Sequence, residues 1–118
     1  MKSVVRWTGG RTMEGETESG KVTPIYSDTA PSPMEMALQA HAACSLVDLR
    51  VGLKDRMENV RAMWVDVEGV RADEPPRVFT SVNMHYVVEG DVPEKLVRRI
   101  LTLSHEKDCS VGIMISRS

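Results

Sequence analysis

The longest apolar segment of the chain covers residues 36–47 and contains almost no strongly polar side chain. Ser32 stands before it as a candidate N-cap, Pro33 at the first helical position and Glu35 three residues after the serine, which is the sequence form of a capping box. Because apolar residues occupy nearly every face, the pattern predicts a central, buried helix that begins at Ser32 or Pro33 and fades near Gly52.

Alternating apolar and polar positions predict strands on both sides of this helix. The segments before it are short, are separated by glycines, and are typical of an antiparallel meander. Those after it are longer, are separated by Asp-Glu-Pro-Pro, and are typical of a hairpin. The predicted strands cover residues 2–7, 11–17, 21–27, 60–72 and 78–88.

A second, shorter helix is predicted after the hairpin. Asp91 is its expected N-cap, with Glu94 three residues on, and its apolar stripe is expected to face the sheet. This stripe consists of Leu96, Val97, Ile100, Leu101 and Leu103. A last short strand is predicted over residues 111–115. The order of the elements predicts one α+β domain, residues 1–118, with a largely antiparallel sheet.

Composition narrows the class of protein. The chain has 118 residues, of which 27% are charged and 42% apolar, and its net charge is −2, values typical of a soluble globular domain. Its lysines and arginines are scattered, which argues against a nucleic-acid partner. No run of 18 apolar residues is present to span a membrane and no secretory signal opens the chain, so we expect a cytoplasmic protein.

The predicted central helix is difficult to cover within one chain. A helix that is apolar on nearly every face needs more cover than one small sheet and one other helix provide. A symmetric dimer that sandwiches two such helices would supply it. The sequence therefore favours a homodimer.

Two cysteines are the candidate reactive groups. Cys44 lies in the middle of the long helix, and Cys109 follows it by 65 positions. In a reducing compartment such residues are two structural thiols, a redox couple or part of a metal site. His41 and His105 stand three and four residues before these cysteines, a spacing that permits a Cys2His2 zinc site. The alternative is a core histidine and a histidine at a helix C-terminus.

The sequence also predicts roles for two further polar residues, Asp48 and His85. Asp48 follows Cys44 by one helical turn, where its charge would disfavour the thiolate. Its expected role is capping or an ion pair with a base such as Arg50 or Lys54. His85 lies on one face of a predicted strand and is expected to be solvated.

Two motifs carry a family resemblance. The segment SPMEMALQAHAACSLVD, residues 32–48, and the segment SHEKDCSV, residues 104–111, together resemble the OsmC/Ohr family of osmotically induced and organic-hydroperoxide-resistance proteins. The resemblance covers nearly the whole chain. It implies an intertwined homodimer, two thiols that meet near the dimer interface, and thiol-dependent reduction of peroxides. It implies neither a cofactor nor a metal.

The resemblance also assigns roles to particular residues. Cys44 is similar to the peroxidatic thiol of the family and Cys109 to its resolving thiol. The chemistry agrees, because a thiolate oxidised to a sulfenic acid condenses with a second thiol to a disulfide that other thiols reduce. Arg11, which follows Gly9 and Gly10, is the best candidate for the arginine that activates the thiol.

The chain departs from the family pattern at two places. The peroxidases carry a glutamate directly after the proline, whereas this chain has Met34 there and its acid, Glu35, one residue on. A shift of one residue turns a helical side chain by about 100 degrees, so Glu35 is either a catalytic residue or a capping-box residue. Family members also usually continue past the position of Ser118 with another strand, so either an edge strand is absent here or a natural tail is missing.

Two functions from different classes remain. The first is a two-cysteine peroxidase of oxidative stress defence, which acts on a hydroperoxide and is recycled by a thiol or dithiol reductant. The second is a non-catalytic dimer that senses redox state or binds a small ligand. The pair of cysteines favours the first function, and Met34 favours the second.

Overall fold

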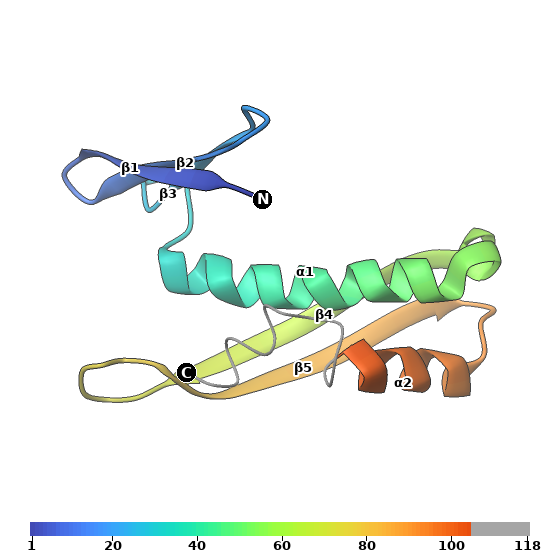
Figure 1. The fold of residues 1–118 in the computed structure, drawn as a ribbon. Coiled ribbons are helices and arrows are strands. Elements are labelled where there is room, and N and C mark those ends of the chain that lie inside the picture. Colours follow the sequence, from blue (N-terminus) through green and yellow to red (C-terminus); the bar gives the residue numbers. More distant parts are fainter. Residues whose placement is uncertain (105–118) are drawn as a thin grey trace. The chain divides into compact units, whose positions relative to one another are not determined.

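A computed structural model of the chain describes residues 1–104 (Figure 1). The described chain falls into two compact units, Met1–Met36 and the part that begins at Ala37. The predicted strand at residues 111–115 lies outside the described residues. The elements are β1 (Ser3–Gly9), β2 (Thr12–Thr17), β3 (Val22–Ile25), α1 (Pro33–Leu53), the 3-10 helix η1 (Lys54–Asn59), β4 (Val60–Arg71), β5 (Phe79–Gly90) and α2 (Glu94–Leu103).

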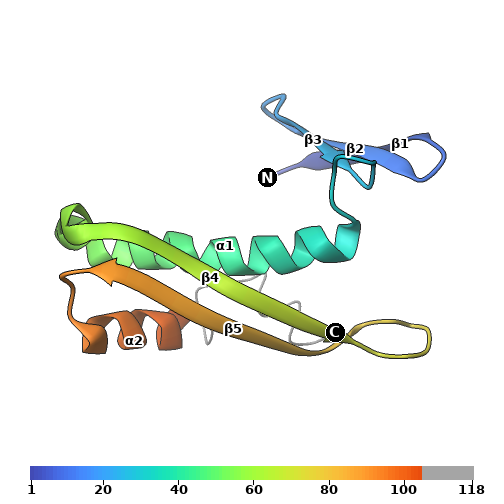
Figure 2. The ribbon, with the colours of Figure 1, turned by 180° about the vertical axis from the view of Figure 1, so that it is seen from behind.

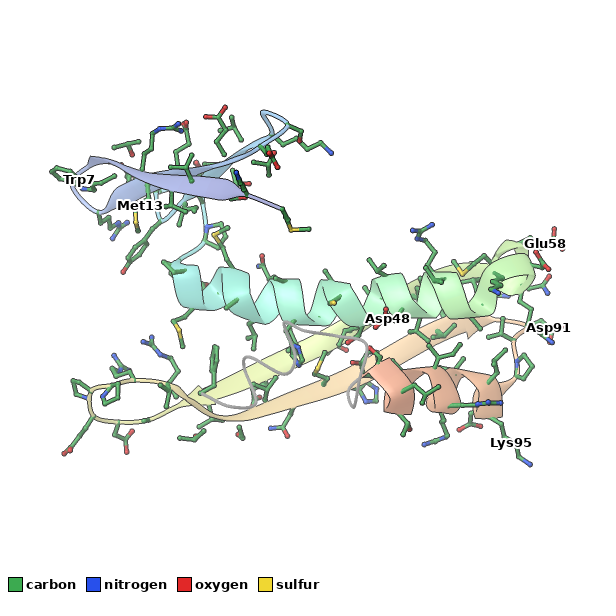
Figure 3. All side chains as sticks on the ribbon, in the orientation of Figure 1. Trp7, Met13, Asp48, Glu58, Asp91 and Lys95 are labelled. Carbon is green, nitrogen blue, oxygen red and sulfur yellow. The ribbon has the colours of Figure 1, made fainter. Side chains whose placement is uncertain are left out.

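The first unit contains the predicted meander. Its strands form one antiparallel sheet in the order β1-β2-β3, in which Trp7 of β1 stands opposite Met13 of β2 (Figure 3). Pro24 lies on β3 at the edge of this sheet, where a residue that lacks an N–H is tolerated. The β2–β3 turn passes through Gly20 at a φ of +88°, a conformation that glycine adopts without strain. The meander is therefore confirmed.

The second unit is built on the predicted hairpin. Strands β4 and β5 pair antiparallel, with Val65 opposite Tyr86 on a half-buried face and Asp66 opposite His85 on an exposed face. This alternation confirms the period-2 pattern in the sequence and the solvated position of His85. Helix α1 runs along the hairpin in both views (Figures 1 and 2).

Small residues allow α1 to approach the hairpin closely. A Cβ atom at Gly69 of β4 would lie 2.5 Å from Phe79 Cε1 and 3.1 Å from Leu38 Cδ1. These distances are shorter than van der Waals contact, so a larger residue at this position would force Phe79 to move. Helix α1, β4 and the start of β5 therefore meet at Gly69.

Helix α1 buries one stripe of its surface. The buried positions are His41, Ala42, Ser45, Leu49 and Leu53. A second apolar stripe, which we call the open stripe, consists of Ala40, Ala43, Val47 and Val51 and is exposed in the described part of the chain. Half of the surface of Val47 and of Val51 is accessible. The sequence predicts that nearly every face of this helix is covered. The described residues of one chain cover only the buried stripe and leave the open stripe exposed.

Helix α2 begins differently from the sequence prediction. The expected N-cap, Asp91, is wrong: α2 begins at Glu94, and its N-cap is Pro93, which makes no side-chain capping hydrogen bond. Val92 precedes a proline, and such residues are disfavoured in helical conformation, so the helix does not extend back to Asp91. The Asp91 backbone N–H instead donates to the Asn59 carbonyl at 3.1 Å and closes the end of the hairpin.

The helices in the described part of the chain are not long and apolar enough to cross a membrane.

The apolar stripe predicted for helix α2 is largely confirmed. Four of its five residues are half-buried, whereas Leu103 is 42% exposed.

Candidate thiol site

Cys44 lies in the middle of α1, on the boundary between the buried stripe and the open stripe. Its own side chain is half-buried. The next residue, Ser45, is fully buried and donates a long hydrogen bond of 3.5 Å to the His41 carbonyl one turn earlier. His41 is itself 5% exposed, which confirms a core position for this histidine. The packed stripe therefore holds the helix in place while the thiol stays at the edge of the packed surface.

Asp48 connects the thiol helix to the end of α2. Ser104 Oγ donates a hydrogen bond to Asp48 Oδ2 at 2.5 Å, and Ser104 is fully buried. Figure 3 shows Asp48 on the side of α1 that faces the C-terminal end of α2. The expected pairing of Asp48 with Arg50 or Lys54 is therefore wrong. A partner 56 positions away in the sequence gives no local signal, so sequence spacing did not reveal it.

A second contact joins the same two helices one turn further along. Gly52 of α1 faces Ile100 of α2 so closely that a Cβ atom at position 52 would lie 2.6 Å from Ile100 Cδ1. Gly52 and Ile100 are each four residues, about one helical turn, from Asp48 and Ser104. The two contacts together define an antiparallel pairing of α1 and α2, which we call the helix seam.

Arg11 lies in the β1–β2 turn of the first unit. Its Nη2 atom lies 3.4 Å from Asp28 Oδ1, and its guanidinium stands 5.2 Å from the centre of the Tyr26 ring. Ion pairs and cation–π contacts at such exposed sites stabilise weakly, about 1 kcal/mol or less. Because Arg11 belongs to the first unit and Cys44 to the second, their pairing stays a prediction.

Glu35 forms the predicted capping box. The Ser32 backbone N–H donates to Glu35 Oε1 at 3.0 Å, and the Glu35 backbone N–H donates to Ser32 Oγ at 3.2 Å. Hydrogen bonds from the Ser32 backbone N–H and from its hydroxyl lower the pKa of the Glu35 carboxyl below its ordinary value. The structural role of Glu35 is thus confirmed, and a catalytic role for it stays a prediction.

Two predicted site residues, His105 and Cys109, lie outside the described residues. The zinc alternative requires both of them and therefore also stays a prediction. Within residues 1–104, no group of three or more His, Cys, Asp or Glu side chains is placed to hold a metal ion.

A cavity that sequence reasoning missed lies between β5 and α2. Its volume is about 520 Å³. Its apolar lining comes from Met84, Tyr86, Val88, Val97 and Leu101, and its polar lining includes His85 and the ion pair of Arg98 with Glu94, at 2.8 Å. The apolar stripe of α2 predicted that this helix packs against the sheet. A sequence does not show whether side chains fill the space between the two surfaces.

The fold and the thiol helix define the class: an α+β protein with a cysteine at the centre of its longest helix. A family model described as OsmC-like protein matches residues 26–118. Protein YhfA from Escherichia coli strain K12 is 38% identical over 122 residues, which cover 100% of this chain and 91% of that protein. The chain belongs to the OsmC-like family.

Solved structures agree with this assignment. A hypothetical protein from Aquifex aeolicus VF5 is similar with a TM-score of 0.86 and 27% identity, over 99% of this chain and 87% of that chain. A Legionella pneumophila protein named as an organic hydroperoxide resistance protein OsmC and predicted redox protein has a TM-score of 0.68 and 18% identity, over 98% of this chain and 89% of that one. The second likeness shows the fold alone.

Proposed function

We propose that this protein reduces hydroperoxides with Cys44 as the nucleophile and Cys109 as the resolving thiol, in defence against oxidative stress. Family membership and the redox description of the Legionella relative support the class of reaction. One observation in this chain supports the pairing of the thiols. Ser104, five residues before Cys109, is hydrogen-bonded to Asp48, one helical turn after Cys44.

The length of the chain permits the two thiols to meet. Five residues span at most about 17 Å when extended. Asp48 and Cys44 are separated along the helix axis by about 6 Å. A segment of this length therefore permits Cys109 to reach Cys44, and a short flexible tether would give the second thiol a millimolar or higher effective concentration.

The proposed reaction has three balanced steps. The Cys44 thiolate attacks one peroxide oxygen, so that an S–O bond forms, the O–O bond breaks and the leaving alkoxide takes a proton to become an alcohol. The Cys109 thiol then attacks the sulfenic sulfur of Cys44, and the disulfide forms as water leaves. A dithiol reductant finally exchanges with this disulfide, which restores both thiols and oxidises the reductant.

Activation of Cys44 requires a cation. An apolar setting disfavours a thiolate because the charge loses its hydration. We assign this role to Arg11, brought from the first unit of either subunit. The chemistry depends on reduced thiols, so we place it in the cytoplasm.

The open stripe supports a homodimer as the working form. Ala40, Ala43, Val47 and Val51 form an apolar stripe along the helix that carries Cys44, exposed in the described part of one chain. A second copy would present the same stripe, as a two-fold interface requires. Such a dimer would bury the stripe and place the two thiol helices side by side.

Consumption of an organic hydroperoxide in the presence of a dithiol tests the function. Wild type is expected to turn over and Cys44→Ser to lose activity to the uncatalysed rate. Cys109→Ser keeps the attacking thiol, and the dithiol can condense with its sulfenic acid in place of Cys109, so this variant is expected to turn over more slowly than wild type. Equal rates for wild type and Cys44→Ser would reject the proposal.

A binding function is the second candidate, and two observations favour it. Glu35 is engaged by Ser32 in the capping box, and the family's usual glutamate position is Met34. The cavity between β5 and α2 is large enough for a small apolar ligand. If this function holds, an apolar fluorescent dye is expected to bind wild type and to bind Leu101→Trp more weakly, because the larger side chain reduces the cavity volume.

A further inference from the structure

We propose that the cavity between β5 and α2 binds an apolar carboxylic acid, whose carboxylate is held by Arg98. The inference rests on the second candidate function and names the chemical class of its ligand. It does not depend on the thiol chemistry. The described lining of the cavity comes from β5, α2 and the turn between them, and Cys44 is not among these residues.

The cavity has the size and the apolar walls of a small-molecule site. Its volume of about 520 Å³ lies within the usual range of ligand pockets, roughly 300–1,000 Å³. Met84 and Tyr86 form the wall from β5, where Tyr86 Oη donates to Met84 Sδ at 3.6 Å. Val97 and Leu101 form the wall from α2, and all four residues are half-buried. An apolar ligand would bury the surface that these walls leave exposed.

Arg98 supplies a cation beside these walls. Residues three and four apart in a helix are neighbours on one face, so the lining positions 94, 97, 98 and 101 share one face of α2. Arg98 stands one turn before Leu101 on this face. A ligand whose apolar body lies on Leu101 can therefore reach the guanidinium with a carboxylate, the group that arginine binds through paired N–H donors.

Glu94 occupies this guanidinium only weakly. The Arg98 Nε and Nη2 atoms donate to one carboxylate oxygen, Glu94 Oε1, at 3.0 and 2.8 Å, and Nη1 takes no part in this contact. The two side chains are 76% and 77% exposed, and an ion pair at such exposure stabilises weakly because water screens it. A ligand carboxylate that the cavity walls shield in part can therefore displace Glu94.

The position of Glu94 makes an anion the favoured ligand. Glu94 is the first residue of α2, where the helix dipole stabilises a carboxylate, so Glu94 tolerates the loss of Arg98. A cationic ligand would instead take Glu94 from Arg98 and add a positive charge near the positive end of the helix. The exchange therefore favours a carboxylate over an ammonium group.

Calorimetric titration of the full-length protein with octanoate and with 1-octanol tests this charge recognition. The two probes share an apolar chain and differ in the carboxylate, and octanoate is expected to bind wild type more tightly. Arg98→Gln is expected to weaken octanoate about fivefold, the factor of a favourable exposed ion pair, and to leave 1-octanol within twofold. Glu94→Gln is expected to strengthen octanoate about threefold, because it frees Arg98 and removes a like charge. A general disturbance of the helix would not move the two variants in opposite directions.

Two controls locate the effect. Arg99→Gln removes the same charge from an exposed position of α2 that does not line the cavity, and it is expected to leave octanoate binding unchanged. Leu101→Trp reduces the cavity volume and is expected to weaken both probes. Equal losses of octanoate affinity in Arg98→Gln and Arg99→Gln would overturn the inference.

The remaining outcomes separate the inference from the functions on which it could depend. A protein that binds the apolar dye in the cavity but binds 1-octanol as tightly as octanoate, or binds neither, would overturn the inference while the second candidate function stands. A wild type that binds neither the dye nor the probes would reject that function together with the inference. Consumption of hydroperoxide decides the first candidate function independently of all these results.

Discussion

Ile100 occupies the space that any side chain at Gly52 would need. A Cβ atom at position 52 would lie 2.6 Å from Ile100 Cδ1 and 2.8 Å from its Cγ1. The absence of a side chain on one helix therefore sets how closely α2 packs on α1, one turn away from the Asp48–Ser104 hydrogen bond.

Gly52→Ala is expected to destabilise the protein. Overpacking against Ile100 costs about 1–3 kcal/mol, and the better helix propensity of alanine returns at most about 1 kcal/mol. The midpoint of urea unfolding should therefore fall. Gly15→Ala is the matched control, because a Cβ atom there would make an ordinary contact of 3.6 Å with Ile25. A Gly52→Ala protein as stable as wild type would contradict the packing of the helix seam.

The capping box predicts that Glu35→Gln lowers the thermal stability of the protein by an amount that depends on pH. Because the pKa of Glu35 is lowered in the folded state, its charge stabilises the fold above the ordinary pKa of a glutamate, about 4.3, and this stabilisation is lost as the pH falls through the folded-state pKa. The difference in Tm between wild type and Glu35→Gln should be largest at neutral pH and shrink in acid. Ser32→Ala removes the hydroxyl but keeps the backbone N–H, which is the larger cause of the lowered pKa, so in that background the difference should shrink and persist. A difference between wild type and Glu35→Gln that is as large in acid as at neutral pH would disprove the coupling.

Arg11→Ala is expected to slow the alkylation of Cys44 at neutral pH. A cation near a thiol favours the thiolate by about one pKa unit or more, so the reactive pH range should move upward and the rate at pH 7 should fall about tenfold. Arg6→Ala removes a cation paired with Glu16 in the same sheet and serves as the control. Equal alkylation rates in the two variants would show that Arg11 does not activate Cys44.

Val47→Asp is expected to dissociate the proposed dimer. A carboxylate on the open stripe would lose its hydration at a two-fold interface, and the interface would contain it twice. Sedimentation of wild type at micromolar concentration should give a dimer, which we expect to bury over roughly 2,000 Å², and Val47→Asp should give a monomer. Thr102→Asp places the same charge on an exposed position of α2 and should leave the dimer intact. A monomeric wild type would refute the dimer.

Local signals predicted much of the fold. The serine, proline and glutamate at residues 32, 33 and 35 fixed the start of α1, and alternation fixed the hairpin, because both depend on neighbours in the sequence. The N-cap of α2 failed, since a proline two residues after Asp91 outweighed the capping signal.

The candidate site was less accessible to sequence reasoning. The sequence predicted Cys44 in the middle of the long helix. Its position at the edge of the buried stripe was not predicted, because apolar residues occupy nearly every face of that helix. The contacts of Asp48 with Ser104 and of Gly52 with Ile100 join residues about 50 positions apart, and no local pattern encodes such pairs. The cavity between β5 and α2 depends on how completely two surfaces fill the space between them, which only coordinates show.

Mapping the disulfide formed on oxidation tests the central claim most directly. Reduced protein is treated with one equivalent of an organic hydroperoxide, the remaining thiols are blocked, and the digest is examined by mass spectrometry. The account predicts a peptide that links Cys44 to Cys109 within one chain and that is absent from Cys44→Ser. Consumption of the peroxide with both cysteines recovered as blocked, unlinked thiols would contradict it.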